Sequence, residues 1–102
     1  MKLTVLKGIA NDLISHLDHQ IWFGYFKDLS FPIDVNVLEE KDGLSKMCVS
    51  FFKERLPSSF DLKRIKKINI KVGKSKTFLK MAVYVTVDEK EFVAKGGSIM
   101  NS

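Results

Sequence analysis

Apolar residues in the N-terminal part of the chain recur with the period of a helix. Intervals of three and four residues alternate along the stripe Leu3, Leu6, Ala10, Leu13 and Leu17. Residues at this spacing lie on one face of a helix, and polar residues occupy the opposite face. The pattern predicts an amphipathic helix over residues 3–19.

A second apolar stripe runs through the middle of the chain, from Leu44 to Leu56. It predicts a second helix with Asp42 or Ser45 as its N-cap, because their side-chain oxygens accept hydrogen bonds from the first turn. Pro57 ends this helix, since the residue before a proline avoids the α region.

An aromatic run separates the two predicted helices. Five of the eleven aromatic residues lie within ten positions: Trp22, Phe23, Tyr25, Phe26 and Phe31. Aromatic residues favour strands, so the segment from residue 20 onward is predicted to begin as a strand, and residues 27–32 are predicted to form a turn. Apolar and polar residues then alternate from Ile33 to Val37, which predicts another strand. We expect these two strands to form a hairpin.

The clearest strand signal is the alternation of apolar and polar residues over 67–72 and again over 78–87. A four-residue loop over 73–76 joins the two runs and predicts a second hairpin. The predicted register pairs Val72 with Thr77, Ile70 with Leu79 and Ile68 with Met81.

The remaining segments complete the predicted fold. Ser59 is able to cap a short helical turn, so residues 59–66 are either helical or extended. A short strand is predicted over residues 91–95, and residues 96–102 are predicted to be a flexible C-terminal tail. We therefore expect one α+β domain over residues 1–95. It has two layers in the order α-β-β-α-β-β, with two helices on one face of a four-stranded antiparallel sheet.

Positive charge is concentrated in one segment of the chain. The 102 residues include 17 basic and 12 acidic side chains, for a formal net charge of +5. Eight of the basic residues and none of the acidic ones lie between Lys63 and Lys80. The rest of the chain therefore has nine basic against 12 acidic residues, a net charge of −3. A localised positive field attracts an anionic partner.

The outward face of the second predicted hairpin combines lysines with aromatic rings. Rings stack on unpaired bases and lysines neutralise phosphates, so we expect a non-enzymatic module that binds nucleic acid or another polyanion. The expected contacts are Lys67, Lys71, Lys74, Lys76, Phe78, Lys80 and Tyr84. Secondary basic contacts are expected from Lys63, Arg64 and Lys66.

Two other interpretations of this surface stay open. Lysines on the solvent face of a hairpin also protect its edge against aggregation, and the two rings are also able to pack on a neighbouring strand, a subunit or the C-terminal tail. Arginine, the better ligand for phosphate, occurs once among the eight basic residues.

The aromatic run supports an alternative function. Neighbouring residues of a strand point to opposite faces, so one helix layer cannot cover all of these rings. Exposed apolar area of this kind often marks an interface. The first alternative is therefore a structural or adaptor subunit that homodimerises or binds a protein partner through the aromatic segment.

A second alternative is a small metal-dependent enzyme. Asp12, His16 and His19 lie on one side of the first predicted helix, and carboxylate and imidazole are ligands for divalent transition metals. Their spacing does not match H-E-x-x-H. Cys48 lies on the apolar side of the second helix and is expected to behave as a small hydrophobic residue.

Recognisable catalytic patterns are absent from the sequence. It contains no glycine-rich phosphate loop, no G-x-S-x-G and no paired C-x-x-C, so no catalytic residue and no cofactor are expected. A single cysteine excludes an internal disulfide and fits a reducing compartment. Neither a signal peptide nor a membrane-spanning run is present, which favours a cytoplasmic protein without a membrane partner.

Overall fold

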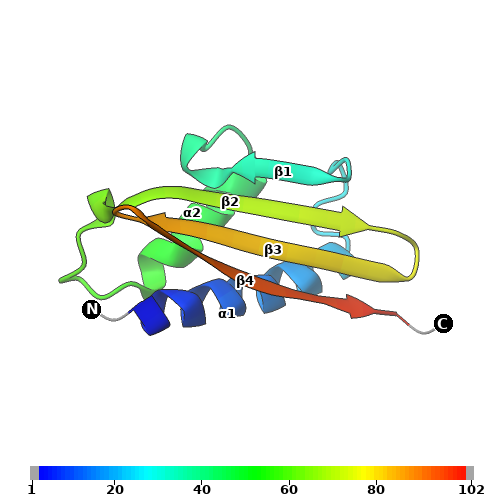
Figure 1. Ribbon diagram of the computed structural model, residues 1–102. Coiled ribbons are helices and arrows are strands. Elements are labelled where there is room, and N and C mark those ends of the chain that lie inside the picture. Colours follow the sequence, from blue (N-terminus) through cyan, green and yellow to red (C-terminus); the bar gives the residue numbers. More distant parts are fainter. Residues whose placement is uncertain (1–2, 101–102) are drawn as a thin grey trace.

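The computed structural model describes residues 3–100 and places both helices on the same side of a four-stranded sheet (Figure 1). In chain order the elements are α1 (Leu3–Trp22), β1 (Ile33–Asn36), the 3-10 helix η1 (Val37–Glu39), α2 (Gly43–Arg55), the 3-10 helix η2 (Leu62–Arg64), β2 (Ile65–Lys74), β3 (Phe78–Val87) and β4 (Lys90–Ile99). The predicted α+β class, with two helices and a four-stranded antiparallel sheet, is confirmed. The observed order is α-β-α-β-β-β, so the predicted order α-β-β-α-β-β is wrong.

The strand predicted for the aromatic run before residue 27 does not form, because α1 continues into this segment. Ile21 is buried with the apolar stripe of the helix. The N–H of Phe23 still donates to the carbonyl of His19 at 3.0 Å. Gly24 then ends the helical path with a φ of 75°, a conformation that glycine adopts without steric cost. The aromatic residues therefore lie at a helix end and in the turn that follows it.

The fourth strand of the sheet is β4, near the C-terminal end of the chain. The sheet order is β1-β2-β3-β4, and β4 is longer than the strand predicted over residues 91–95. It pairs with β3 along its whole length, so the predicted flexible tail is wrong for residues 96–99. Gly96 and Gly97 hide this strand in the sequence, because glycines interrupt the alternation of side chains. Residues 101–102 of the predicted tail lie outside the described part of the chain.

Strands β2 and β3 pair in a register four residues away from the predicted one. Val72 lies opposite Met81 rather than Thr77, and Ile70 lies opposite Val83. A shift by an even number of residues leaves every side chain on the same face of the sheet. The apolar pattern alone therefore fits both registers equally well.

The turn between β2 and β3 sets the observed register. The N–H of Ser75 donates to the carbonyl of Phe78 at 3.0 Å. Ser75 Oγ accepts hydrogen bonds from the N–H groups of Thr77 and Phe78, at 3.2 and 3.1 Å. β2 consequently continues through Gly73, the residue at which the sequence pattern starts the loop.

Aspartate side chains cap α2 and η2. Asp42 Oδ1 accepts a hydrogen bond from the N–H of Ser45 at 2.7 Å, so Asp42 is the N-cap of α2. Asp61 caps η2 in the same way, in place of the predicted Ser59. Residues 59–66 are thus helical in η2 and extended where β2 begins.

One hydrophobic core lies between the helices and the sheet. Alternate residues of β3 are buried in it: Leu79, Met81, Val83, Val85 and Val87. Both helices lie on this side of the sheet, and within residues 3–100 no helix covers the other side (Figure 1). None of the helices in this described part is long and apolar enough to cross a membrane.

Helix α1 packs closely on β4. A Cβ at Gly96 would come within 2.6 Å of Ile14 Cγ2, so the strand approaches the helix where it has no side chain. Trp22 Nε1 donates a hydrogen bond to Ser98 Oγ at 2.7 Å. These contacts hold the C-terminal half of β4 against the end of α1.

Gly97 should not tolerate a side chain. Its φ is 149°, and a Cβ there would collide with the carbonyl of Leu79 on β3. We expect Gly97→Ala to lower the free energy of unfolding by about 2 kcal/mol, measured by urea titration followed through Trp22 fluorescence.

Gly8→Ala is the matched control for this substitution. Gly8 is exposed on α1, and a Cβ there would meet nothing within 4 Å. Alanine favours a helix over glycine, so this variant should gain about 0.5–1 kcal/mol of stability. A Gly97→Ala protein as stable as the wild type would contradict the pairing of β4 with β3.

Candidate nucleic-acid interface

The face of the sheet turned away from the helices is called the open face from here on. Its side chains follow from the strand register, because directly opposite residues of antiparallel strands share a face. They are Asp34, Asn36, Lys67, Asn69, Lys71, Gly73, Phe78, Lys80, Ala82, Tyr84, Thr86, Glu91, Val93, Lys95, Gly97 and Ile99.

Four exposed lysines stand on the open face. Lys67, Lys71 and Lys80 are candidate contacts from the sequence, and the structure brings them together on this face. Lys95 of β4 joins them. Sequence reasoning missed Lys95 because the register of β4 was unknown. Its alternation with the buried Ala94 is the signal that identifies its face.

The two aromatic candidates differ in accessibility. Phe78 is 44% exposed, whereas Tyr84 is half-buried. The Lys71 ammonium lies 5.3 Å from the centre of the Tyr84 ring, within the range of a cation–π contact. The same ammonium lies 3.9 Å from the Asp34 carboxylate. Phe78 is therefore the more accessible ring, and Tyr84 is covered by Lys71.

Two neighbouring hollows shape the open face beside Phe78. Their volumes are about 690 and 790 Å³, and both are lined by Phe78, Lys80 and Gly96. The first, called the lysine hollow, is also lined by Lys71, Lys95, Gly73, Ala82 and Pro32. The second, called the outer hollow, is also lined by Gly97, Ser98 and Ile99.

Two of the predicted contacts do not lie on the open face. Lys74 pairs with Leu79, whose buried side chain marks the helix side of the sheet. The Lys74 ammonium accordingly lies 5.0 Å from the centre of the Trp22 ring. Lys76 is exposed in the turn between β2 and β3.

The predicted secondary contacts lie at the opposite end of β2 from this turn. Lys63 and Arg64 belong to η2, and Lys66 follows at the start of β2. Arg64 Nη2 lies 3.0 Å from Asp88 Oδ2. This hydrogen bond raises the pKa of Arg64 and lowers the pKa of Asp88. The eight basic residues of the segment therefore do not share one surface, and Arg64 is already paired.

The structure does not bring Asp12, His16 and His19 together as metal ligands. The ring centre of His16 lies 5.3 Å from that of Phe51, and the ring centre of His19 lies 4.3 Å from that of Phe23. Among residues 3–100, no three histidine, cysteine, aspartate or glutamate side chains are arranged to hold a metal ion.

Cys48 is buried in α2, on the side that faces the core. Burial, with a smaller contribution from the negative charge of Asp42, raises the pKa of its thiol to about 12. The thiolate is the reactive form of cysteine, so Cys48 has the character of a core residue rather than of a nucleophile.

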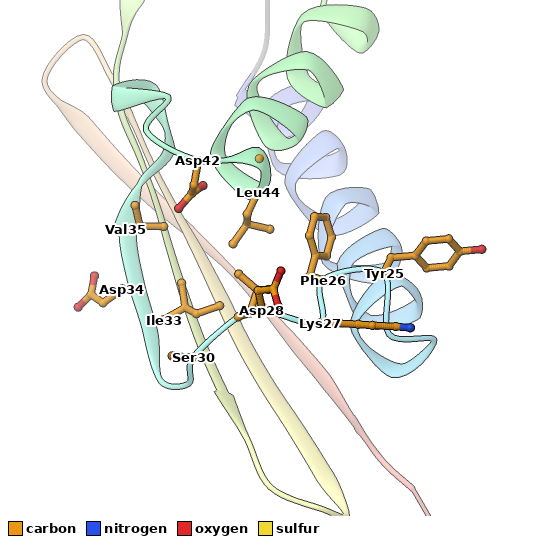
Figure 2. A pocket seen from close by; sticks show the side chains of 12 residues that line it. Tyr25, Phe26, Lys27, Asp28, Ser30, Ile33, Asp34, Val35, Asp42 and Leu44 are labelled. Carbon is orange, nitrogen blue, oxygen red and sulfur yellow. The ribbon is translucent and has the colours of Figure 1, made fainter.

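A third hollow, of about 560 Å³, lies between the turn after α1, the strand β1 and the start of α2 (Figure 2). Asp42 lines it, but its carboxylate caps α2. Figure 2 shows the Asp34 side chain pointing to the far side of β1, and the side chains of Tyr25 and Lys27 pointing away from the hollow. The charged groups at this hollow therefore do not converge on one point.

The aromatic segment divides between core and surface. Trp22, Phe26 and Phe31 pack partly against the core. Phe23 and Tyr25 are 69% and 67% exposed. These two rings are the part of the segment that a protein partner is able to reach.

No protein-family model, characterised protein or solved structure matches this chain. Its function is therefore inferred from its own residues and their arrangement.

The buried thiol of Cys48 makes a prediction about alkaline pH. The folded protein keeps the thiol protonated up to a pKa of about 12, whereas the unfolded chain ionises it near pH ~8.5. The stabilisation from burying the neutral thiol is complete below the pKa of the unfolded state, and it is lost as the pH rises above that value. The wild type should lose up to about 1.4 kcal/mol per pH unit above about pH 9, relative to Cys48→Ala. Urea titrations of both proteins at several pH values measure this difference, and a constant difference would contradict the prediction.

Proposed function

We propose that this protein is a non-enzymatic module that binds a polyanion, and single-stranded nucleic acid in particular, on the open face of its sheet. The main support is the combination of four exposed lysines and an exposed aromatic ring on one face. Within residues 3–100 no helix covers that face, so a ligand reaches it without displacing part of the protein.

The charges of the open face favour an anion. Four lysines stand against two carboxylates, Asp34 and Glu91. Asp34 is engaged by Lys71, whereas Lys80 and Lys95 form no ion pair within the described residues 3–100. Their ammonium groups are therefore available to neutralise phosphates, and the release of counterions drives such binding.

The layout of the face suits an extended ligand. Phe78 and Tyr84 are six residues apart on β3, which corresponds to about 20 Å along the strand. Lys80 lies between them, and Lys71 is beside them on β2. Such a face suits unpaired nucleotides, because a base is able to stack on the accessible Phe78 ring while the backbone follows the lysines.

A face that served only to keep the protein soluble would need no exposed apolar side chains. Ile99 is 76% exposed and lies opposite Phe78, so the end of the open face carries an apolar pair. Apolar area next to lysines favours a ligand with both apolar and anionic groups.

Lysines of the open face should account for most of the affinity. We expect a triple Lys71→Ala, Lys80→Ala, Lys95→Ala variant to bind a labelled single-stranded oligonucleotide at least about tenfold more weakly at low salt. The slope of log affinity against log salt should fall by about 0.7 for each phosphate that the variant no longer neutralises. Fluorescence anisotropy at several salt concentrations measures both quantities.

The control removes the same charge from the helix side of the protein. Lys27, Lys46 and Lys53 are exposed in the turn after α1 and on α2. Replacement of all three by alanine lowers the net charge by the same amount as the first triple variant. Because these lysines lie away from the open face, this variant should lose much less affinity for the oligonucleotide. Equal losses in both triple variants would mean that net charge, rather than the open face, drives binding. No binding by the wild type at low salt would refute the proposed function.

The exposed rings of Phe23 and Tyr25 favour a second candidate, a subunit that binds a protein partner or a second copy through this pair. Burial of apolar rings is not screened by salt, so such a complex should persist at about 1 M salt. Replacement of both rings by serine should convert it to monomer, as measured by light scattering. A wild-type protein that is monomeric at high concentration would argue against self-association through these rings.

A further inference from the structure

Phe78 stands at the junction of the two hollows on the open face. It lines both of them together with Lys80. The lysine hollow lies toward β1 and β2, and the outer hollow lies toward the end of β4. A ligand that fills both hollows therefore passes directly beside the Phe78 ring.

Glycines leave the floor of this region flat. Gly73 and Gly97 lie on either side of Lys80 in the same cross-strand row. Neither has a side chain that would rise from the sheet, and a Cβ at Gly73 would meet nothing within 4 Å. The backbone beside Lys80 is therefore accessible to a flat group.

Charge is unevenly distributed around the lysine hollow. Lys71, Lys80 and Lys95 line it, but Asp34 lines it as well and lies 3.9 Å from the Lys71 ammonium. The side of the hollow near β1 is thus partly neutralised. An anionic group has its most favourable position on the other side, next to Lys80 and Lys95.

We infer that the two hollows form a subsite for unpaired nucleobases. One base lies in the lysine hollow against the Phe78 ring, and its phosphates lie near Lys80 and Lys95. The next base lies in the outer hollow, toward Ile99. This inference rests on the proposed function and deepens it, because it assigns the base contacts to Phe78 and the two hollows and so requires unpaired bases rather than a polyanion alone.

The chemistry of the hollows supports this ligand class. Both hollows are open to solvent and lined mostly by apolar surface, with lysine side chains beside it. A polyphosphate has no ring to place against Phe78, and a sulfated sugar offers only a saturated ring that itself carries the charged groups. A duplex keeps its bases paired and stacked inside, so it is unable to present them to the hollows.

A pair of oligonucleotides with equal phosphate counts tests the subsite. One is a labelled single-stranded oligothymidylate. The other has the same length but two adjacent abasic positions at its centre. Both strands are short enough that the thymidines on either side of the centre are too few to bind by themselves. Anisotropy should show that the intact strand binds at least about fivefold more tightly, since stacking on an aromatic side chain contributes substantially per base. Equal affinity would overturn the subsite and leave polyanion binding intact. No binding of either strand at low salt would overturn the proposed function as well.

Substitutions locate this preference for bases. Phe78→Ala should remove most of the difference in affinity between the two oligonucleotides. Phe78→Trp should keep this difference, because tryptophan still stacks on a base. Phe23→Ala is the matched control, since Phe23 is exposed but lies at the end of α1. It should leave the preference unchanged.

Gly73→Val tests the hollow without removing the ring. A Cβ at this position would meet nothing within 4 Å, and valine favours a strand, so the variant should fold. The added methyl groups occupy the floor of the lysine hollow and should lower the preference for the intact strand to about the level of Phe78→Ala. If both folded variants, checked by circular dichroism, keep the wild-type preference, the base subsite is not at these hollows.

Discussion

Burial of only one side of the sheet is the constraint on which the other features of this protein depend. Both helices pack on the same face, so the buried apolar side chains of β2 and β3 all point toward them. The strict alternation of a strand then sends every intervening side chain to the other face. Lys71, Lys80 and Phe78 are exposed together for this reason. The open face is thus a direct consequence of how the core is built.

The same alternation divides the basic segment. Lys80 and Lys74 belong to the same hairpin, yet Lys74 lies over Trp22 on the helix side. Arg64 is paired with Asp88 at the opposite end of β2 from the turn. A run of positive charge in the sequence therefore becomes a smaller group on the open face, with further charges at both ends. Charges elsewhere add to the long-range field but lie on other surfaces of the protein.

Contacts between α1 and β4 complete the open face. Gly96 allows the strand to approach Ile14, and the hydrogen bond from Trp22 to Ser98 holds the end of the strand. Without β4, the edge of the sheet would be β3, and Lys95 would be absent from the face. Trp22, which the sequence pattern assigns to a strand, therefore lies at the end of a helix and holds strand β4 in place.

The α+β class, both helices and the inward face of β2 and β3 follow from the sequence alone, because periods of 3.6 and 2 separate apolar from polar positions locally. The side of the sheet on which Lys71, Lys80 and Phe78 lie follows for the same reason. Only the tertiary structure decided the register of β2 with β3, since even shifts leave the faces unchanged and the turn at Ser75 selects one of them. The length of β4 was likewise decided only by the tertiary structure. Gly96 and Gly97 of that strand do not show the alternation of apolar and polar residues. They are required because α1 packs closely on Gly96 and the backbone of β3 lies close to Gly97.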